Sequence, residues 1–578
     1  MKELSWKETS ERNMKQKIKE LVLINAVRYG GKANEGSVLG MILSQNPELK
    51  SKIQELKKEI KVEVKEVNKL SLKQQEGLLK KLDVKEFKKE EPHIKKGLPE
   101  LKNVPKKPVF RLAPSPSGPL HIGHTIGLLL NSEYAKKYKG KFILRIEDTN
   151  PENILPEAYN MIVDEVKWLT NSNPEVQIQS DHMSLYYEKA VQLIKLGKAY
   201  VCSCSQIDFK NLVDKSKACP CRNLSIEENL KRWLKMFKGA ENCVLRIKTD
   251  LNDKNPAIRE WPAFRILDVE HPRKGKEFRV WPLMNFSVAV DDYESGINYV
   301  IKGKDHIVNT ERQKWIYKHF NWPTPQYVHY GKIQFTDLRL KTSLIKQGIK
   351  EGKFSGWDDI KLPTVEALKK RGIRHEAFVK LVHEMGPNPV DKRLKSSDFL
   401  GLLFHFNKEL IDLKTNRYFF VENPKLIEIK NAPKLDVKLP LHPAKKDKFR
   451  TFKTSNKFYV QDKLEKGKEY RLIGAFNFKD LKFTSLEHKK DDRIKLIHWL
   501  PELKELVKVE VLMDDGTLKK GLGESSIKDL KLNTIVQFQR FGFCKLDSVE
   551  KGELIPSTPA FDSGKKGEKI YRFWYMHN

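Results

Sequence analysis

His121 and His124 stand one helical turn apart, where turn residues give way to an apolar helical pattern. Residues 109–113 alternate as a strand does, and the Pro/Ser/Gly segment 114–118 then breaks that alternation. The free amides and positive dipole end of a helix start favour phosphate, and two imidazoles can add donors to it. The pattern indicates a phosphate site. The alternative is one surface histidine and one packed histidine in an ordinary α/β protein.

A β-α-β unit must position these histidines. After the first strand, Pro119 fits a first helical position, and Gly140 can end the helix. The residues that predict the buried helix face are Ile122, Ile126, Leu129, Leu130 and Tyr134. Residues 141–146 predict a second strand. Parallel strands joined in this way bind ligands at their carboxyl ends, and Gly123 would let a nucleotide approach the backbone.

Four cysteines could hold a metal. Cys202 and Cys204 are separated by fourteen residues from Cys219 and Cys221. Two CxC pairs can supply the four thiolates of a tetrahedral zinc site, which would tie down a polar, loop-rich segment, so we expect a structural zinc ion. CxC is rarer than CxxC in such sites, and reduced thiols without metal are the alternative.

Composition points to a polyanionic partner. The 578 residues carry a net charge of +33 that is spread along the chain, which favours a long contact surface over one basic tail. A Lys-rich proteome, as in some thermophiles, would give the same charge without a nucleic-acid role. Neither a membrane segment nor a secretion signal is apparent, so we expect a cytoplasmic protein without a membrane partner.

Three short motifs carry a family resemblance. PSGPLHIGH (116–124) resembles the HIGH signature of class I aminoacyl-tRNA synthetases, and RLAPSPSG and RIEDT (145–149) resemble its glutamyl branch, archaeal type. The resemblance implies an α/β protein with a Rossmann-like catalytic domain. The implied segments are a helical N-terminal extension (1–100), two catalytic halves (101–200 and 281–350), an acceptor-end insertion with the zinc site (201–280), a helical connector (351–395) and β-barrel anticodon-binding domains (396–578).

The same resemblance assigns an ATP site. Residues implied to contact ATP are Pro116, Gly118, His121, Gly123, His124, Arg339 and Lys341, with Mg²⁺ accompanying the nucleotide. The last two belong to RLKTS (339–343), which occupies the place of the KMSKS loop, although Thr342 replaces a motif lysine. Such a loop brings positive charge to the triphosphate. Lys346 is a further candidate for these phosphate contacts. The alternative is that the segment is only a basic surface loop.

It also assigns an amino-acid pocket. The residues implied to bind glutamate are Arg111, Ser115, Glu147, Trp281, Asn285 and Lys302. An arginine can pair with both oxygens of the glutamate side chain, and Glu147 with Ser115 would hold the amino group. Trp281 stands where the family usually shows tyrosine. For Glu147, the alternative is a salt-bridged carboxylate at a strand end.

The implied activity is the two-step, ATP-dependent ligation of L-glutamate to tRNA(Glu) by a monomer, through a glutamyl-adenylate. tRNA(Gln) is a further candidate substrate. A glutaminyl-tRNA synthetase is the runner-up, but its strand usually ends FDDT, whereas this chain has IEDT. A non-catalytic tRNA-binding paralogue is the third hypothesis, because the KMSKS match is imperfect.

Other expectations concern the remaining elements. The segment 50–96 alternates charge and predicts a solvated helix and linker, Val288 and Val290 are interpreted as strand residues, and 363–385 predicts a helical connector. Beyond about residue 400 the pattern predicts short strands. Aromatic and basic residues interleaved in these strands suit stacking on anticodon bases: Phe449, Arg450, Phe452, Lys453, Phe538, Arg540 and Phe541.

Overall fold

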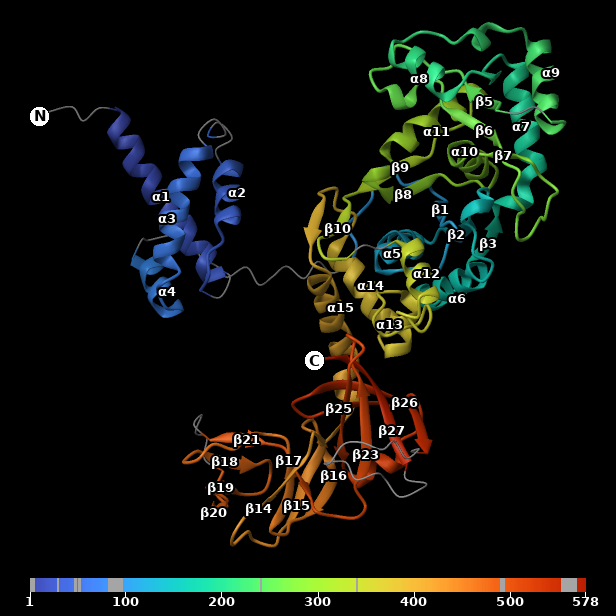
Figure 1. Cartoon of the computed structure of the whole chain (residues 1–578). Helices are drawn as coiled ribbons and strands as arrows, with labels where there is room; N and C mark the ends of the chain where they lie inside the picture. Colours follow the sequence, from blue (N-terminus) through green and yellow to red (C-terminus); the bar gives the residue numbers. More distant parts are fainter. Residues whose placement is uncertain are drawn as a thin grey trace, which may run out of the picture. The chain divides into compact units, whose positions relative to one another are not determined.

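The computed structural model describes residues 6–28, 31–45, 49, 53–81, 97–239, 242–338, 341–488, 494–551 and 569–578. The chain divides into two compact units, Met1–Lys95 and Lys96–Asn578. Figure 1 shows the elements of both units.

The N-terminal unit is helical, as predicted. Its helices are α1 (Trp6–Arg28), α2 (Glu35–Gln45), α3 (Ile53–Val67) and α4 (Leu72–Lys81). The expectation of a solvated helix after residue 50 was wrong for α3, which buries Leu56, Ile60, Val64 and Val67. Their three- and four-residue spacing forms one apolar stripe against the rest of the unit. Residues 82–96, the expected linker, lie outside the described residues.

The expected β-α-β unit begins the second unit. Strand β1 (Val109–Leu112) pairs in parallel with β2 (Lys141–Ile146), which pairs in parallel with β3 (Glu175–Ile178). The connecting helices are α5 (Ile122–Lys137) and α6 (Ala158–Thr170). Strands β8 (Tyr299–Gly303) and β9 (Gln326–Tyr330) form a second parallel pair, and β8 lies beside β1.

Helix α5 begins later than predicted. Pro119 is outside the helix, and His121 is its N-cap. The reason is a pairing that the local pattern does not reveal: Ile122 N donates to Pro363 O at 3.1 Å, and Val365 N donates to Leu120 O at 2.9 Å. The backbone before Ile122 is therefore extended and held by a distant segment.

An antiparallel sheet of order β4-β5-β6-β7 follows. Its strands are β4 (Ala199–Cys202), β5 (Val244–Ile247), β6 (Pro262–Ile266) and β7 (Val280–Pro282). Helix α7 (Met183–Lys195) precedes it, and α8 (Gln206–Asp214) and α9 (Ile226–Phe237) lie between β4 and β5 in the chain. Helices α10 (Met284–Glu294) and α11 (Ile307–Phe320) follow. The strand interpretation of Val288 and Val290 was wrong, because both lie in α10. Every residue of that helix from Asn285 to Asp292 is buried, so no exposed polar face reveals its period.

Further helices connect the sheet to the C-terminal strands. Helices α13 (Val365–Arg371) and α14 (His375–Met385) form the expected connector, and α12 (Thr342–Lys350) precedes them. Helix α15 (Ser396–Ile411) occupies a region in which strands were expected to begin. The short strands β10 (Ile333–Phe335) and β11 (Lys392–Leu394) pair in parallel.

The C-terminal strands confirm the predicted barrel. One sheet has the order β12-β25-β26-β27-β23-β24-β13. Its edge strands, β12 (Asn416–Tyr418) and β13 (Phe420–Glu422), are separated by a single residue, so the two edges meet and the sheet nearly closes. The other strands of this sheet are β23 (Val507–Leu512), β24 (Leu518–Gly523), β25 (Ile535–Phe538), β26 (Gly542–Lys551) and β27 (Lys569–His577).

Smaller sheets pack beside it. Their strands are β14 (Lys425–Glu428), β15 (Asp436–His442), β16 (Lys445–Lys453), β17 (Lys457–Val460), β18 (Glu469–Leu472), β19 (Asn477–Lys479), β20 (Lys482–Ser485), β21 (Lys495–Ile497) and β22 (Leu500–Pro501). A separate aromatic-rich core lies between these strands. Among the described residues, no helix is long and apolar enough to span a bilayer.

Candidate active site

A cavity of about 940 Å³ lies where β1 and β8 end and α5 begins. Eight of the residues predicted from sequence line it: Arg111, Ser115, His121, Gly123, His124, Glu147, Lys302 and Lys341. The β-α-β topology therefore brings the predicted phosphate-binding and amino-acid-binding groups to one cavity, as expected for the carboxyl edge of parallel strands.

The two histidines are fixed by the backbone at the start of α5. His121 Nδ1 accepts from Gly123 N at 3.1 Å, and His124 Nδ1 accepts from His121 N at 3.3 Å. Their rings stack with centroids 3.7 Å apart. Because each Nδ1 is an acceptor, the proton of each neutral ring sits on Nε2. Both rings thus keep a donor for an anion in the cavity.

The charge state of these histidines is also set by the surroundings. Desolvation by the surrounding protein lowers the pKa of His121 to about 4. Desolvation and the neighbouring His121 lower the pKa of His124 to about 3, although His124 is exposed as a residue. Both rings are neutral at physiological pH. They can donate hydrogen bonds to phosphate without carrying charge.

Arg111 is held by a buried acid that the sequence analysis did not single out. Its Nε lies 2.9 Å from Asp292 Oδ1, and its Nη2 lies 3.1 Å from Oδ2. Arg145, which is fully buried, donates to the same Oδ1 at 2.7 Å. Burial alone would raise the pKa of Asp292, but the two arginines hold it below its usual value. Arg111 therefore faces the cavity with a fixed orientation.

Glu147 follows β2 and lines the same wall. Arg145 Nη2 lies 3.6 Å from Glu147 Oε1. Burial raises the pKa of Glu147 in spite of the nearby Arg145 and Arg111. The alternative considered for Glu147 was a salt bridge at the strand end, and this 3.6 Å contact with Arg145 is such a salt bridge, longer than a hydrogen bond. The carboxylate therefore remains available to a cationic amino group.

Lys302 contributes a second cation from β8. Its Nζ donates to Gln313 Oε1 at 3.0 Å, and it has no carboxylate partner among the described residues. Burial, followed by the charge of Arg111, lowers the pKa of Lys302 to about 7. Asn285 lies behind this contact: its Oδ1 accepts from Gln313 Nε2 at 3.4 Å, and its Nδ2 donates to Asn309 Oδ1 at 3.3 Å. Asn285 itself does not line the cavity.

Three other predicted residues lie outside the cavity wall. Trp281 is fully buried in β7 and stacks on His271 with centroids 5.2 Å apart, while Met284 lines the cavity instead. Pro116 is buried and accepts from Leu155 N at 2.8 Å. Gly118 is buried as well, and neither residue is part of the cavity wall.

Gly118 permits a close approach between two loops. A Cβ atom at Gly118 would overlap Thr342 Cγ2 and would lie 3.3 Å from the ring of Trp357. Thr342 is the first residue of α12 and directly follows Lys341, which lines the cavity. The threonine that replaces a motif lysine therefore packs against the signature loop. Arg339 lies outside the described residues.

The structure adds cavity residues that sequence reasoning missed. The side chains of His306, Asn309 and Gln313 line the cavity on or beside α11 and form hydrogen bonds around Lys302 and Asn285, while Asp292 lies behind the wall and holds Arg111. The sequence did contain a signal for Asp292. Two adjacent aspartates, Asp291 and Asp292, interrupt an apolar run, and acids buried in such a run require cationic partners.

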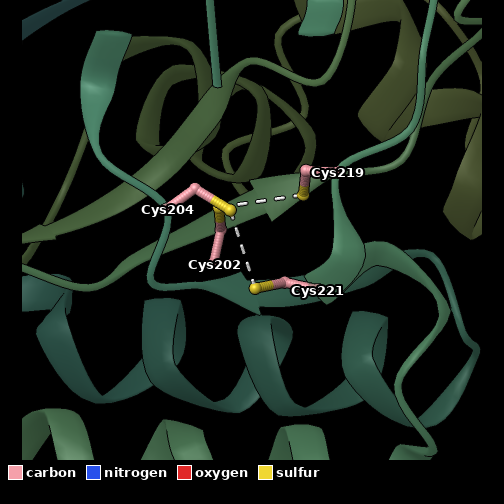
Figure 2. Close-up of side chains that lie close together, drawn as sticks. All are labelled: Cys202, Cys204, Cys219 and Cys221. Carbon is pink, nitrogen blue, oxygen red and sulfur yellow. Dashed lines mark hydrogen bonds between the residues drawn. The ribbon is translucent and has the colours of Figure 1, made fainter. Parts of the chain in front are cut away.

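The four cysteines converge, as predicted. Their Sγ atoms all lie within 4.8 Å of one another, and both Cys202–Cys219 and Cys204–Cys221 are 3.9 Å apart (Figure 2). Zinc–sulfur bonds of about 2.3 Å in a tetrahedron require sulfur atoms about 3.8 Å apart. The donor set and its spacing fit zinc. Cys202 ends β4, and the second pair begins the short helix Pro220–Asn223.

Most of the interleaved barrel residues serve the core. Phe452 and Phe538 are buried, and Arg450 donates to Glu524 Oε2 at 2.7 Å. Arg540 donates to both carboxylate oxygens of Asp462. Phe449, by contrast, is 52% exposed. Of the seven residues, Phe449, Lys453 and Arg540 are exposed.

Comparison with known proteins defines the class. The family described as tRNA synthetases class I (E and Q) matches through its catalytic domain at residues 108–399 and through its anti-codon binding domain at 415–498 and 496–547. The chain belongs to this family, which accords with the parallel sheet, the histidine pair and the barrel.

Curated relatives give a more specific comparison. The glutamate–tRNA ligase of Methanocaldococcus jannaschii is 45% identical over 549 residues, which cover 92% of this chain and 98% of the relative. That of Methanobrevibacter smithii is 42% identical and covers 92% and 97%. A solved glutamate tRNA ligase from Elizabethkingia meningosepticum, in complex with its amino acid, is 20% identical over 53% of this chain and 70% of its own, with a TM-score of 0.37.

Proposed function

We propose that this chain ligates L-glutamate to tRNA(Glu) at the expense of ATP. The observation that carries the proposal is the single cavity that holds two neutral histidine donors at the start of α5 and two cations, Arg111 and Lys302. Nearly full-length relatives named glutamate–tRNA ligase support it.

The ATP end of the cavity is the histidine pair with Gly123. The Nε2 groups of His121 and His124 would donate to phosphoryl oxygens, and Arg339 and Lys341 would add positive charge as pyrophosphate leaves. Mg²⁺ would accompany the nucleotide and neutralise part of its charge. Pro116 and Gly118 act indirectly, by shaping the loop before α5.

The glutamate end is the wall formed by β1, β2 and β8. Arg111 and Lys302 would bind the side-chain carboxylate, and Ser115 with Glu147 would hold the amino group. Asn285 would act through Gln313. Arg111 and Lys302 share one buried counter-ion, Asp292, and this excess of positive charge favours the carboxylate of glutamate over the neutral amide of glutamine. Glutaminyl-tRNA synthetase is therefore ranked second. Trp281 drops out of the proposed pocket.

The chemistry then needs no protein nucleophile. The α-carboxylate of glutamate attacks the α-phosphorus of ATP, a P–O bond forms, and pyrophosphate leaves. A hydroxyl of the terminal ribose of tRNA next attacks the adenylate carbonyl, and AMP leaves. The residues position the reactants and donate hydrogen bonds to the charges that develop.

The barrel would bind the anticodon. Arg417 of β12 and Gln537 of β25 are direct neighbours in a parallel strand pair. Arg417 Nε and Gln537 Oε1 are buried and have no hydrogen-bond partner among the described residues. Both residues are only half-buried, so small side-chain movements would expose these atoms to a nucleobase edge, which offers both donors and acceptors.

The cysteine cluster would bind zinc. Cys202, Cys204, Cys219 and Cys221 would hold it as thiolates, and Arg232 Nη1, 3.7 Å from Cys221 Sγ, would offset part of their negative charge. The ion would anchor α8 and its loops to β4. Its role is structural, since four protein ligands leave no open coordination position.

We also infer the organisation of the chain. The segments 1–100, 101–200, 201–280, 281–350, 351–395 and 396–578 remain our division into extension, first catalytic half, insertion, second catalytic half, connector and barrel domains. The working unit would be a monomer in the cytoplasm.

ATP–pyrophosphate exchange in the presence of tRNA tests the proposal. Exchange should depend on glutamate and not on glutamine. Glutamine-dependent exchange would favour the second candidate, and no exchange with either amino acid would favour a non-catalytic tRNA-binding protein. Charging purified tRNA(Glu) and tRNA(Gln) side by side would then decide whether both are substrates.

A further inference from the structure

Glu165 is a buried acid that the proposed reaction does not use. It lies in α6, is 5% exposed, and its Oε2 accepts a hydrogen bond from Leu120 N at 2.7 Å. Its Oε1 meets no partner at hydrogen-bond geometry among the described residues, although the Glu366 amide also faces the carboxyl. Burial raises the pKa of Glu165 to about 8. An acid in such a place is costly, so its hydrogen bond to Leu120 requires an explanation.

That bond reaches the residue directly before the histidine pair. Leu120 precedes His121, the N-cap of α5, and its carbonyl accepts from Val365 N at 2.9 Å. Ile122 N donates to Pro363 O on the same side. The signature backbone at 120–122 is thus bound to segment 363–365 along one edge, while Glu165 occupies the remaining donor of Leu120.

Segment 363–365 is itself tied to the loop that carries Lys341. Thr364 Oγ1 donates to Trp357 O at 2.7 Å, and Trp357 lies against Gly118 together with Thr342. If 363–365 alone held the signature backbone, the histidines would follow any movement of that loop. Glu165 ties the same backbone to α6, which packs against α5.

We propose that Glu165 is a positioning residue for ATP: through Leu120 it fixes the backbone that aims His121 and His124 into the cavity. The proposal rests on the function proposed above. Glu165 does not line the cavity, and its contact with the signature backbone is the hydrogen bond from Leu120 N. An apolar residue of similar size would leave the Leu120 amide buried without an acceptor.

Three variants test this. Glu165→Leu removes the acceptor, and Glu165→Gln retains one. Thr170→Val is the matched control, because Thr170 is a buried residue of α6 whose hydroxyl has only near neighbours in the chain as partners, Val166 O and Ser172 Oγ. We expect Glu165→Leu to lower kcat for glutamate-dependent exchange by about 10- to 100-fold per titrated active site. KM for glutamate should stay unchanged, because Arg111 and Lys302 lie on other elements. Glu165→Gln should restore most of kcat.

The control separates positioning from stability. Glu165→Leu and Thr170→Val should both lower Tm, whereas only Glu165→Leu should lower kcat per active site. Equal kcat losses in these two variants, or a Glu165→Gln variant as impaired as Glu165→Leu, would overturn the proposal. An unmodified protein without exchange activity would instead count against the proposed function.

Discussion

Arg111 and Asp292 form a buried ion pair with two contacts, Nε to Oδ1 at 2.9 Å and Nη2 to Oδ2 at 3.1 Å. The residues are 181 positions apart in the chain and come from a strand and a helix that meet beneath the cavity. Asp292 takes up two of the donor groups of Arg111, so the guanidinium can turn only its remaining edge to a substrate. We expect Lys302, which lacks such a carboxylate among the described residues, to share the binding of a substrate carboxylate with that edge.

Replacing Arg111 tests the assignment of this wall. Arg111→Leu should abolish glutamate activation, a loss of at least about 100-fold in kcat/KM, because a charge-assisted contact is removed and Asp292 loses a partner. tRNA binding should be nearly unchanged. ATP–pyrophosphate exchange and a tRNA filter-binding assay measure the two effects, and unchanged exchange would remove Arg111 from the pocket.

The lowered pKa of Lys302 predicts a pH dependence. Below about pH 7 its amine is protonated and binds a carboxylate, and above pH 7 the cation is lost. We therefore expect kcat/KM for glutamate to fall as the pH rises past 7. Lys302→Arg, which stays charged, should remove this decline. Identical pH profiles for the two proteins would show that Lys302 does not control glutamate binding.

The fixed tautomers predict different effects for two substitutions of His124. Glutamine can place a donor near the position of Nε2, whereas asparagine mimics Nδ1 and loses that donor. His124→Asn should lower kcat for exchange by about 10²- to 10³-fold, as expected when one donor to a developing oxyanion is removed. His124→Gln should retain more activity. The reverse order would place the functional nitrogen at Nδ1.

The contact between Gly118 and Thr342 predicts a rescue. Gly118→Ala should push α12 away from the signature loop and lower kcat for exchange by about 10-fold, because a displacement of about 1 Å costs heavily in an aligned site. Adding Thr342→Ser removes the overlapping Cγ2 atom and should recover activity. If the double variant stays as slow as Gly118→Ala, then Trp357 or another neighbour sets the limit.

The cysteine cluster predicts about one zinc ion per chain by elemental analysis. Cys219→Ser combined with Cys221→Ser should lose it and increase protease cleavage between β4 and α9, since the ion would fix that segment. Cys544→Ser is the control, because Cys544 is a buried thiol in the barrel. A full complement of zinc in the double variant would place the metal elsewhere.

Several expectations depended on local signals and were met. The strands at 109–112 and 141–146, the helix between them and the short C-terminal strands follow from periodicity and turn residues. The helical start was misplaced by three residues, because the pairing of 120–122 with 363–365 is not encoded locally. Val288 and Val290 were misassigned because a helix buried on all sides shows no amphipathic period. Trp281 was assigned by motif position, yet its ring points into the core.

The sequence by itself determined which chemical groups are present and where many of the helices and strands form, because spacing and residue type act over a few residues. It determined the histidine pair, the four thiolates and the candidate arginine. The tertiary structure alone decided their partners: Asp292 for Arg111, Gln313 for Lys302, Glu165 for Leu120 and Thr342 for Gly118. Each of these contacts joins residues between 11 and 224 positions apart. Such contacts arise from packing and burial, which no local pattern specifies.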